Sequence, residues 1–118
     1  MGRLTTHVLD TARGCPAAGM AYVLYALGAD GARQEVCRGL TNHDGRASAP
    51  LLEGAALVAG NYELAFEVAA YFAAAGVEQA DPPFLGRVPL CFGIADTAAH
   101  YHVPLLVSPW SYSTYRGS

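Results

Sequence analysis

Two segments of the chain alternate strictly between large apolar side chains and other residues, which is the period of a β-strand that buries one face. They span residues 62–68 and 88–94. The positions that share one face are Tyr62, Leu64, Phe66 and Val68 in the first segment and Val88, Leu90, Phe92 and Ile94 in the second. A chain with such segments is expected to pack sheets face to face over a common core.

Glycine and proline divide the rest of the chain into short pieces, which favours an all-β sandwich over a helical bundle. Further strands are expected at residues 5–9, 20–27, 34–40, 100–107 and 110–116. Residues 69–76 are rich in alanine and stop at Gly76, which predicts one short helix. A tight turn ends at Gly45, where glycine can adopt positive φ without steric cost. The expected fold is an all-β sandwich of seven or eight strands with one short helix.

Length and composition indicate one folded unit. The 118 residues predict a single domain that spans residues 1–118, because one hydrophobic core usually serves about 100–150 residues. An apolar fraction of 53% with only 14% charged residues excludes a disordered chain. So low a charged fraction also indicates that an oligomer covers part of the surface.

The charged residues disfavour two classes of partner. The net charge is −3, and all seven basic residues are arginines. They are scattered along the chain rather than gathered in a basic stripe. Nucleic acid and anionic membranes are therefore not expected as partners.

Cysteine usage and hydropathy bear on the compartment. The three cysteines, an odd number without CxxC spacing, indicate a reducing environment rather than a disulfide framework. No charged segment followed by an apolar one precedes Leu4, so no signal peptide is predicted. The longest apolar stretches are too short to span a membrane. These features predict a cytoplasmic protein.

Histidine is the residue type best suited to chemistry here, and the chain has four. His100 and His102 lie two apart in an expected strand, so their side chains point to the same face. Such a pair could bind a metal, but the further ligands are missing from the sequence, and we predict no metal and no cofactor. The other use of histidine is as a general acid or base, since its ordinary pKa of about 6.5 lies close to neutrality. His7, in the middle of an expected strand, suits either that use or a structural hydrogen bond.

Arg46 directly follows the predicted turn, where the next extended segment begins. A guanidinium presents several donors in a planar fork and suits a ligand with anionic oxygens, although an arginine at a strand edge is more often simply solvated. The GxSxG motif of serine hydrolases does not occur in the sequence. Attack by an activated water is therefore expected in preference to a covalent acyl-enzyme.

Four blocks of sequence, in this order, resemble one family. They read LTTHVLDTARGCPAAG at 4–19, TNHDGR at 41–46, HYHVPLLVSPWSYSTY at 100–115 and YRGS at 115–118. Together with the segments between them they cover nearly the whole chain. The chain is similar to the transthyretin-like 5-hydroxyisourate hydrolases of urate breakdown.

The resemblance implies a transthyretin-like sandwich that assembles as a homotetramer, a dimer of dimers, with the apolar segment 103–107 at an interface. It also implies hydrolysis of 5-hydroxyisourate, the unstable product of urate oxidation, to 2-oxo-4-hydroxy-4-carboxy-5-ureidoimidazoline without a cofactor. A groove between sheets of two subunits would bury such a site and strengthen its charge interactions.

By the same resemblance His7, Arg46 and His102 are expected in the catalytic site. The two histidines would position and deprotonate water, with the roles of base and acid open between them, and Arg46 would hold the substrate. His100 is expected to support the site from behind His102.

The resemblance also places the terminal tetrapeptide in the site. Tyr115, Arg116 and Gly117 are expected at the substrate, and Arg116 is also expected to anchor the tail by pairing with a carboxylate. Ser118 is expected to orient a histidine or the water, through its side chain or its free carboxylate.

Two other functions fit the same composition. A non-catalytic transthyretin-like carrier would bind an aromatic ligand in a central channel, and a small structural module would expose a polar face without converging His and Arg. A carrier has no need of both histidines, Arg46 and the complete YRGS ending, so the hydrolase is favoured.

Overall fold

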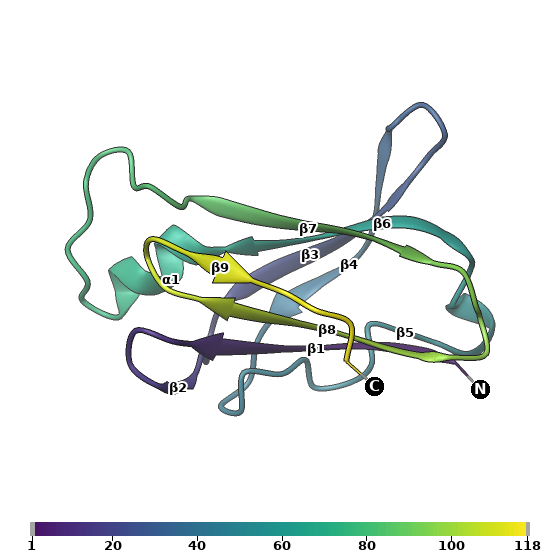
Figure 1. Ribbon diagram of the computed structural model, residues 1–118, viewed down its shortest axis with the longest axis horizontal. Helices are drawn as coiled ribbons and strands as arrows, with labels where there is room; N and C mark the ends of the chain where they lie inside the picture. The colour runs from purple at the N-terminus through teal and green to yellow at the C-terminus, as the bar shows by residue number, and fades with distance from the viewer. Residues whose placement is uncertain (1, 118) are drawn as a thin grey trace.

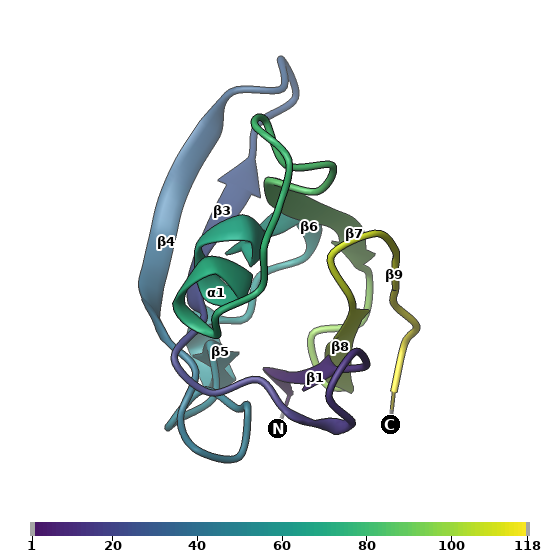
Figure 2. The same cartoon turned by 90° about the vertical axis from the view of Figure 1, so that its left-hand side faces the viewer.

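The computed structural model describes residues 2–117, which form two facing β-sheets with one α-helix at one end (Figure 1, Figure 2). Sheet A has the strand order β2-β1-β8-β9, with β5 also paired to β1, and sheet B has the order β4-β3-β6-β7. The elements are β1 (Arg3–Asp10), β2 (Cys15–Pro16), β3 (Ala21–Leu27), β4 (Arg33–Leu40), β5 (Leu52–Glu53), the 3-10 helix η1 (Gly54–Ala56), β6 (Gly60–Glu67), α1 (Val68–Ala74), β7 (Arg87–Ile94), β8 (His100–Val107) and β9 (Tyr112–Ser113). None of the helices in this described range has the length and apolar character needed to cross a membrane.

The core between the sheets includes the apolar positions that the alternation predicted, although Phe92 is only partly buried. Leu64 and Phe66 of β6 are fully buried, and Val88 of β7 is almost fully buried. Phe72 of α1 is also fully buried, and it closes the core at the end where the helix lies. The predicted β-sandwich with one short helix is therefore confirmed.

Strand β6 is central in sheet B, between β3 and β7, and some of its outward-facing side chains are also buried. Glu63 of β6 stands between Tyr25 and Cys91 in the ladder and is only 7% exposed. Its carboxylate lies 3.6 Å from the guanidinium of Arg33, which offsets part of the cost of removing the charge from water.

The strand expected at 110–116 is wrong for most of its length. Oγ of Ser108 accepts hydrogen bonds from the backbone N–H groups of Trp110 and Ser111, which turns the chain. Strand β9 then covers only Tyr112–Ser113, and the rest of the tail runs along β8. Two further short strands, β2 and β5, lie where no strand was expected, so the described part of the chain has nine strands rather than seven or eight.

Strand β8 divides its residues between the core and the outer face of sheet A. Val103, Leu105 and Val107 are buried in the core, and Pro104 and Leu106 alternate with them on the outer face. Three of the five residues in the apolar run 103–107 therefore fill the core, and the expected subunit interface stays a prediction for Pro104 and Leu106.

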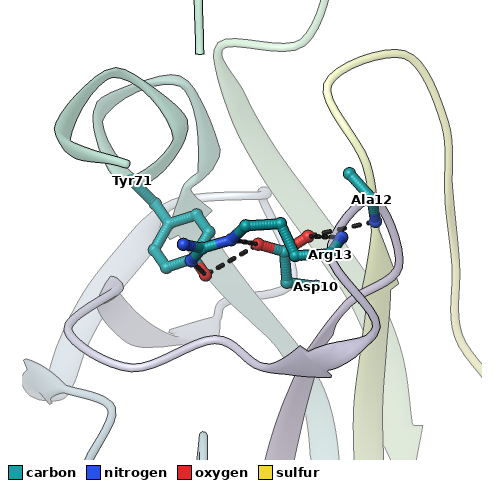
Figure 3. A network of polar contacts seen from close by, with 4 residues as sticks. All are labelled: Asp10, Ala12, Arg13 and Tyr71. Atoms are coloured by element: carbon teal, nitrogen blue, oxygen red, sulfur yellow. Dashed lines mark hydrogen bonds and ion pairs between the residues drawn. The ribbon is translucent and has the colours of Figure 1, made fainter. Parts of the chain in front are cut away.

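A buried carboxylate joins α1 to the end of β1. Asp10 accepts hydrogen bonds on one oxygen from the backbone N–H groups of Ala12 and Arg13, each at 3.0 Å. Its other oxygen accepts from the Arg13 side chain at 2.9 Å and from the Tyr71 hydroxyl at 2.8 Å (Figure 3). Burial alone would raise the pKa of Asp10, but the hydrogen bonds from Arg13 and Tyr71 outweigh burial and hold that pKa below its ordinary value.

Replacing Asp10 with Asn should destabilise the fold, because the new amide would place donors against the donors of Arg13 and Tyr71. We expect the free energy of unfolding at neutral pH, measured by urea denaturation, to fall by roughly 1–3 kcal/mol. Since the folded-state pKa of Asp10 is lowered, its contribution is present above the ordinary value of 3.8 and is lost as the pH falls through the lowered one.

The difference between the wild type and Asp10→Asn should therefore shrink in acid. Asp30→Asn is the control, because Asp30 is an exposed loop carboxylate, and it should change stability by less than about 0.5 kcal/mol. A difference for Asp10→Asn that stays constant into strong acid would contradict the proposed role of the carboxylate.

Candidate active site

The parallel register of β1 and β8 determines which side chains lie together on the outer face of sheet A. Thr5 lies opposite His102, and His7 lies two residues further along β1. Leu4 and Val8 of the same strand are fully buried in the core, so the residues between them that alternate with these two point outward. The two histidines predicted as catalytic therefore share one face of the sandwich.

The turn that follows β4 brings Arg46 to this face. The side-chain oxygen of Asn42 closes the turn by accepting hydrogen bonds from two of its backbone N–H groups, including that of Arg46 at 3.1 Å. The carbonyl of Gly45 accepts a hydrogen bond from the N–H of Val8 at 2.8 Å, and Arg46 forms an isolated antiparallel bridge with His7. Arg46 is exposed beside the half-buried His7.

Gly45 is needed in this turn for two reasons. Its φ of +76° lies in the left-handed region, as the sequence predicted. A Cβ at this position would also lie 2.4 Å from the carbonyl oxygen of Val8. Glycine therefore allows the turn to lie directly against β1.

The tail approaches the histidines from the other side of β8. Oγ1 of Thr114 donates to the carbonyl of Pro104 at 2.7 Å, and the N–H of Gly117 donates to the carbonyl of His102 at 2.7 Å. A Cβ on Gly117 would lie 2.8 Å from a carbon of the His102 ring, so the missing side chain permits this close approach. Ser118, which was expected in the site, lies outside the described residues.

Arg116 meets an aromatic ring where a carboxylate was expected. Its guanidinium carbon lies 4.1 Å from the centre of the Tyr101 ring, a cation–π contact. No carboxylate of residues 2–117 forms an ion pair with it. Tyr115, beside it, is 59% exposed.

Thr5 connects the two histidines of β8. Its Oγ1 lies 2.9 Å from Nε2 of His100 and 2.8 Å from Nδ1 of His102. His7 does not share this contact, and its strand position is fixed by the isolated bridge with Arg46. Sequence reasoning identified the histidines but missed Thr5. The available signal was its position two residues before His7, on the same face of the strand.

The surroundings of the two predicted catalytic histidines keep their rings neutral. Burial lowers the pKa of His102, and the positive charge of Arg46 lowers it further, with smaller contributions from His100 and His7. Burial and Arg46 also lower the pKa of His7, although Asp44 partly offsets them. At neutral pH both rings therefore keep a lone pair, which a general base needs.

Two open hollows share His100 and His102 in their walls. One, of about 500 Å³, is also lined by Arg46, and the other, of about 820 Å³, is also lined by Tyr115 and Gly117. Within residues 2–117, no three His, Cys, Asp or Glu side chains gather closely enough to hold a metal ion. The groups present can bind an anionic molecule and transfer protons.

Replacing Gly45 with Ala should disturb the site through the backbone, because the new methyl group must displace the carbonyl of Val8 or the turn that carries Arg46. We expect thermal or urea unfolding to show a loss of about 2–5 kcal/mol. Gly31→Ala is the matched control, since Gly31 has a similar φ of +81° with nothing near its missing Cβ. It should cost only the backbone strain, about 1 kcal/mol. Equal losses in the two variants would show that the contact with Val8 is unimportant.

Replacing Arg46 with Gln should raise the pKa of both His7 and His102, because it removes a positive charge that lowers both. A reaction that needs the neutral rings would then lose its rate at a higher pH than in the wild type. Titration of the imidazoles by NMR measures the shift directly. Arg38→Gln, on sheet B, is the charge-matched control and should leave both titrations in place. Unshifted titrations in Arg46→Gln would show that Arg46 does not act on the histidines.

Known proteins are similar to this chain over its full length. The family model described as the HIUase/Transthyretin family matches residues 4–117. The chain is 63% identical over 118 residues to the 5-hydroxyisourate hydrolase of Ralstonia nicotianae, and the match covers 100% of both proteins.

Solved structures share the fold. A crystal structure of (S)-allantoin synthase matches with a TM-score of 0.93 at 49% identity, over 99% of this chain and 44% of that longer one. Sea bream transthyretin, in complex with thyroxine, matches with a TM-score of 0.86 at 28% identity, over 98% of this chain and 94% of that one. The sandwich is therefore transthyretin-like, as expected. Together with the match to the family model, these findings establish that the chain belongs to the HIUase/Transthyretin family.

Proposed function

We propose that this chain hydrolyses 5-hydroxyisourate, the product of urate oxidation, to 2-oxo-4-hydroxy-4-carboxy-5-ureidoimidazoline. The observation that carries the proposal is the arrangement of His7 and His102, two imidazoles of lowered pKa, on one sheet face beside the guanidinium of Arg46. Full-length identity of 63% to a 5-hydroxyisourate hydrolase supports the choice of substrate.

In the proposed reaction a neutral histidine, His7 or His102, takes a proton from a water molecule, and the water oxygen adds to an amide carbonyl carbon of the substrate ring. The C–N bond then breaks, and the leaving nitrogen takes up the proton, so the ring opens and the imidazole becomes neutral again. Arg46 donates hydrogen bonds to the anionic oxygens of the substrate. Its charge also stabilises the negative charge that develops as water adds.

The tail supplies the rest of the proposed site. Tyr115 and the backbone of Gly117 line the hollow beside His102 and would contact the substrate there. Arg116 lies over a tyrosine ring, so its proposed role is to fix the path of the tail and to add positive charge to the same hollow. Ser118 is proposed to orient a histidine or the water, through its hydroxyl or its carboxylate.

We also propose a homotetramer, a dimer of dimers, because a single subunit leaves this site open to water. Arg46 is exposed, and Tyr115 is 59% exposed. A second subunit laid across the outer face of sheet A would exclude water there. The charge interactions between substrate and protein would then be stronger, since the local dielectric constant falls.

A non-catalytic carrier is the second candidate, and the likeness to a transthyretin that binds thyroxine favours it. A carrier requires neither imidazoles of lowered pKa nor an arginine beside them. The identity to that transthyretin is 28%, against 63% to the bacterial hydrolase. The hydrolase is therefore the better supported of the two.

The test generates 5-hydroxyisourate from urate with urate oxidase and follows its ultraviolet absorbance with and without this protein. We expect faster decay with the protein. His7→Asn and His102→Asn should each lower kcat by roughly 10²- to 10⁴-fold without unfolding, the usual effect of losing a positioned acid–base group.

His43→Asn is the control for this experiment, because the His43 side chain is 88% exposed on the neighbouring turn, and it should keep the wild-type rate. Decay at the spontaneous rate in the presence of folded wild-type protein would move the assignment to the carrier. A wild-type rate in either His7→Asn or His102→Asn would remove that residue from the mechanism.

A further inference from the structure

We propose that Thr5 is a positioning residue for this reaction. Its hydroxyl holds His102 in the tautomer with the proton on Nδ1 and connects it to His100, so that the two imidazoles share the proton taken from water. The catalytic meaning of this inference rests on the proposed function. The arrangement of protons can be measured without any turnover.

A hydroxyl group can donate only one hydrogen bond, so the protonation of His100 and that of His102 depend on each other through Thr5. Oγ1 of Thr5 lies 2.9 Å from Nε2 of His100 and 2.8 Å from Nδ1 of His102, and it has one proton to donate. It can donate to only one of these nitrogens. At least one ring must therefore present an N–H to the hydroxyl oxygen, and two lone pairs facing Thr5 are excluded.

Three arrangements remain, in which His102 donates, His100 donates or both rings donate. Within residues 2–117 Oγ1 of Thr5 has no other hydrogen-bond acceptor, which disfavours two donating rings, and the electrostatics of the site select between the other two arrangements. Nδ1 of His102 is occupied by Thr5, so Nε2 is the atom left for the hollow that Arg46 also lines. A lone pair near a guanidinium is favoured over an N–H, whose positive end would face the same charge. His102 therefore donates from Nδ1 to Thr5, Thr5 donates to Nε2 of His100, and the free lone pair of His102 is the base.

The charges around His102 oppose an imidazolium at this position. Three of the charged and titratable groups around His102 lower its pKa, namely His7 on β1, His100 on β8 and Arg46 on the turn. The others line one of the two hollows, and they are Arg3, Tyr115 and Arg116. Within residues 2–117, neither hollow is lined by a carboxylate. We infer that a proton that arrives on His102 is shared with His100 through Thr5, which spreads the charge over two rings, although Arg3 lies opposite His100 in the ladder.

Two proton transfers carry the positive charge from His102 through Thr5 to His100. After Nε2 of His102 takes a proton from water, the proton on its Nδ1 passes to Oγ1 of Thr5, and the hydroxyl proton of Thr5 passes to Nε2 of His100. His102 is again neutral, Thr5 is again a hydroxyl, and His100 carries the positive charge, so protons and charge balance. His102 now presents an N–H at Nε2, which can protonate the leaving nitrogen while the two transfers reverse.

The test compares three variants on β1. Thr5→Val keeps the shape of the side chain without the hydroxyl, and Thr5→Ser retains the hydroxyl. Thr6→Val is the matched control, because the hydroxyl of Thr6 donates to the carbonyl of Val103 in the core at 2.7 Å. Thr6→Val makes the same chemical change on the opposite face of the strand.

The first measurement is the ¹⁵N NMR spectrum of the imidazoles in histidine-labelled protein without substrate, which reports the nitrogen that carries the proton. His102 should carry it on Nδ1 in the wild type, in Thr5→Ser and in Thr6→Val, and should shift towards Nε2 in Thr5→Val. A wild-type His102 protonated on Nε2, or an unchanged tautomer in Thr5→Val, would overturn the proposal whether or not the protein hydrolyses anything.

The second measurement is turnover of 5-hydroxyisourate. Thr5→Val should lower kcat roughly 10- to 100-fold with KM changed by less than about twofold, because the base is misplaced while the substrate contacts remain. Thr5→Ser should recover most of the rate, and Thr6→Val should keep kcat even if it lowers stability. An unchanged kcat in Thr5→Val, or an equal loss in Thr6→Val, would overturn the role of Thr5. An inactive wild type would overturn the proposed function, and the spectra would then decide the proton arrangement alone.

Discussion

The parallel pairing of β1 with β8 is the interaction on which the rest of this structure depends. Within residues 2–117 each of the other strand pairs is antiparallel, and only this one joins a strand near the start of the chain to one near its end. Its register sets Thr5 opposite His102 and brings His7 to the same face. It also leaves the far side of β8 free for the tail, and it carries β1 on to Asp10, where the strand is tied to helix α1.

In the proposed mechanism, Arg46 connects substrate binding with the protonation of His7 and His102. The same positive charge that suits an anionic substrate also lowers the pKa of His7 and His102, so the site can be cationic while its histidines stay neutral. The backbone explains why these groups meet, since Arg46 pairs with His7 and the turn lies against β1 through Gly45. A small displacement of that turn would change binding and basicity together.

Local patterns in the sequence predicted those parts of the molecule that local physics decides. Alternation in 62–68 and 88–94 identified the inner faces of β6 and β7, and the need for positive φ identified Gly45. Most of the features that were missed are long-range. Asp10 reads as the start of a turn, yet it is fully buried because Tyr71, from a distant helix, donates to it.

The tail shows the same limit. Its serines and aromatics resemble a strand, but the Ser108 turn and a few side-chain contacts along β8 direct its path. Arg116 makes a cation–π contact with Tyr101, and no pattern in the sequence indicates this pairing. The contacts that Thr5 makes with His100 and His102 likewise depend on one hydroxyl between two rings, which no sequence pattern indicates until the register of β1 and β8 is known.

The pairing of β1 with β8 also constrains how the protein folds. Thr5 and His102 are 97 residues apart in sequence, whereas the β3–β4 and β6–β7 pairs of sheet B join strands that follow one another along the chain. Contacts between distant residues form late, because the entropy of closing a long loop must be overcome first. During synthesis β1 can pair early only with the two-residue strands β2 and β5, and its long partner β8 is absent until residues 100–107 emerge. We therefore expect the face that carries the histidines to form after sheet B.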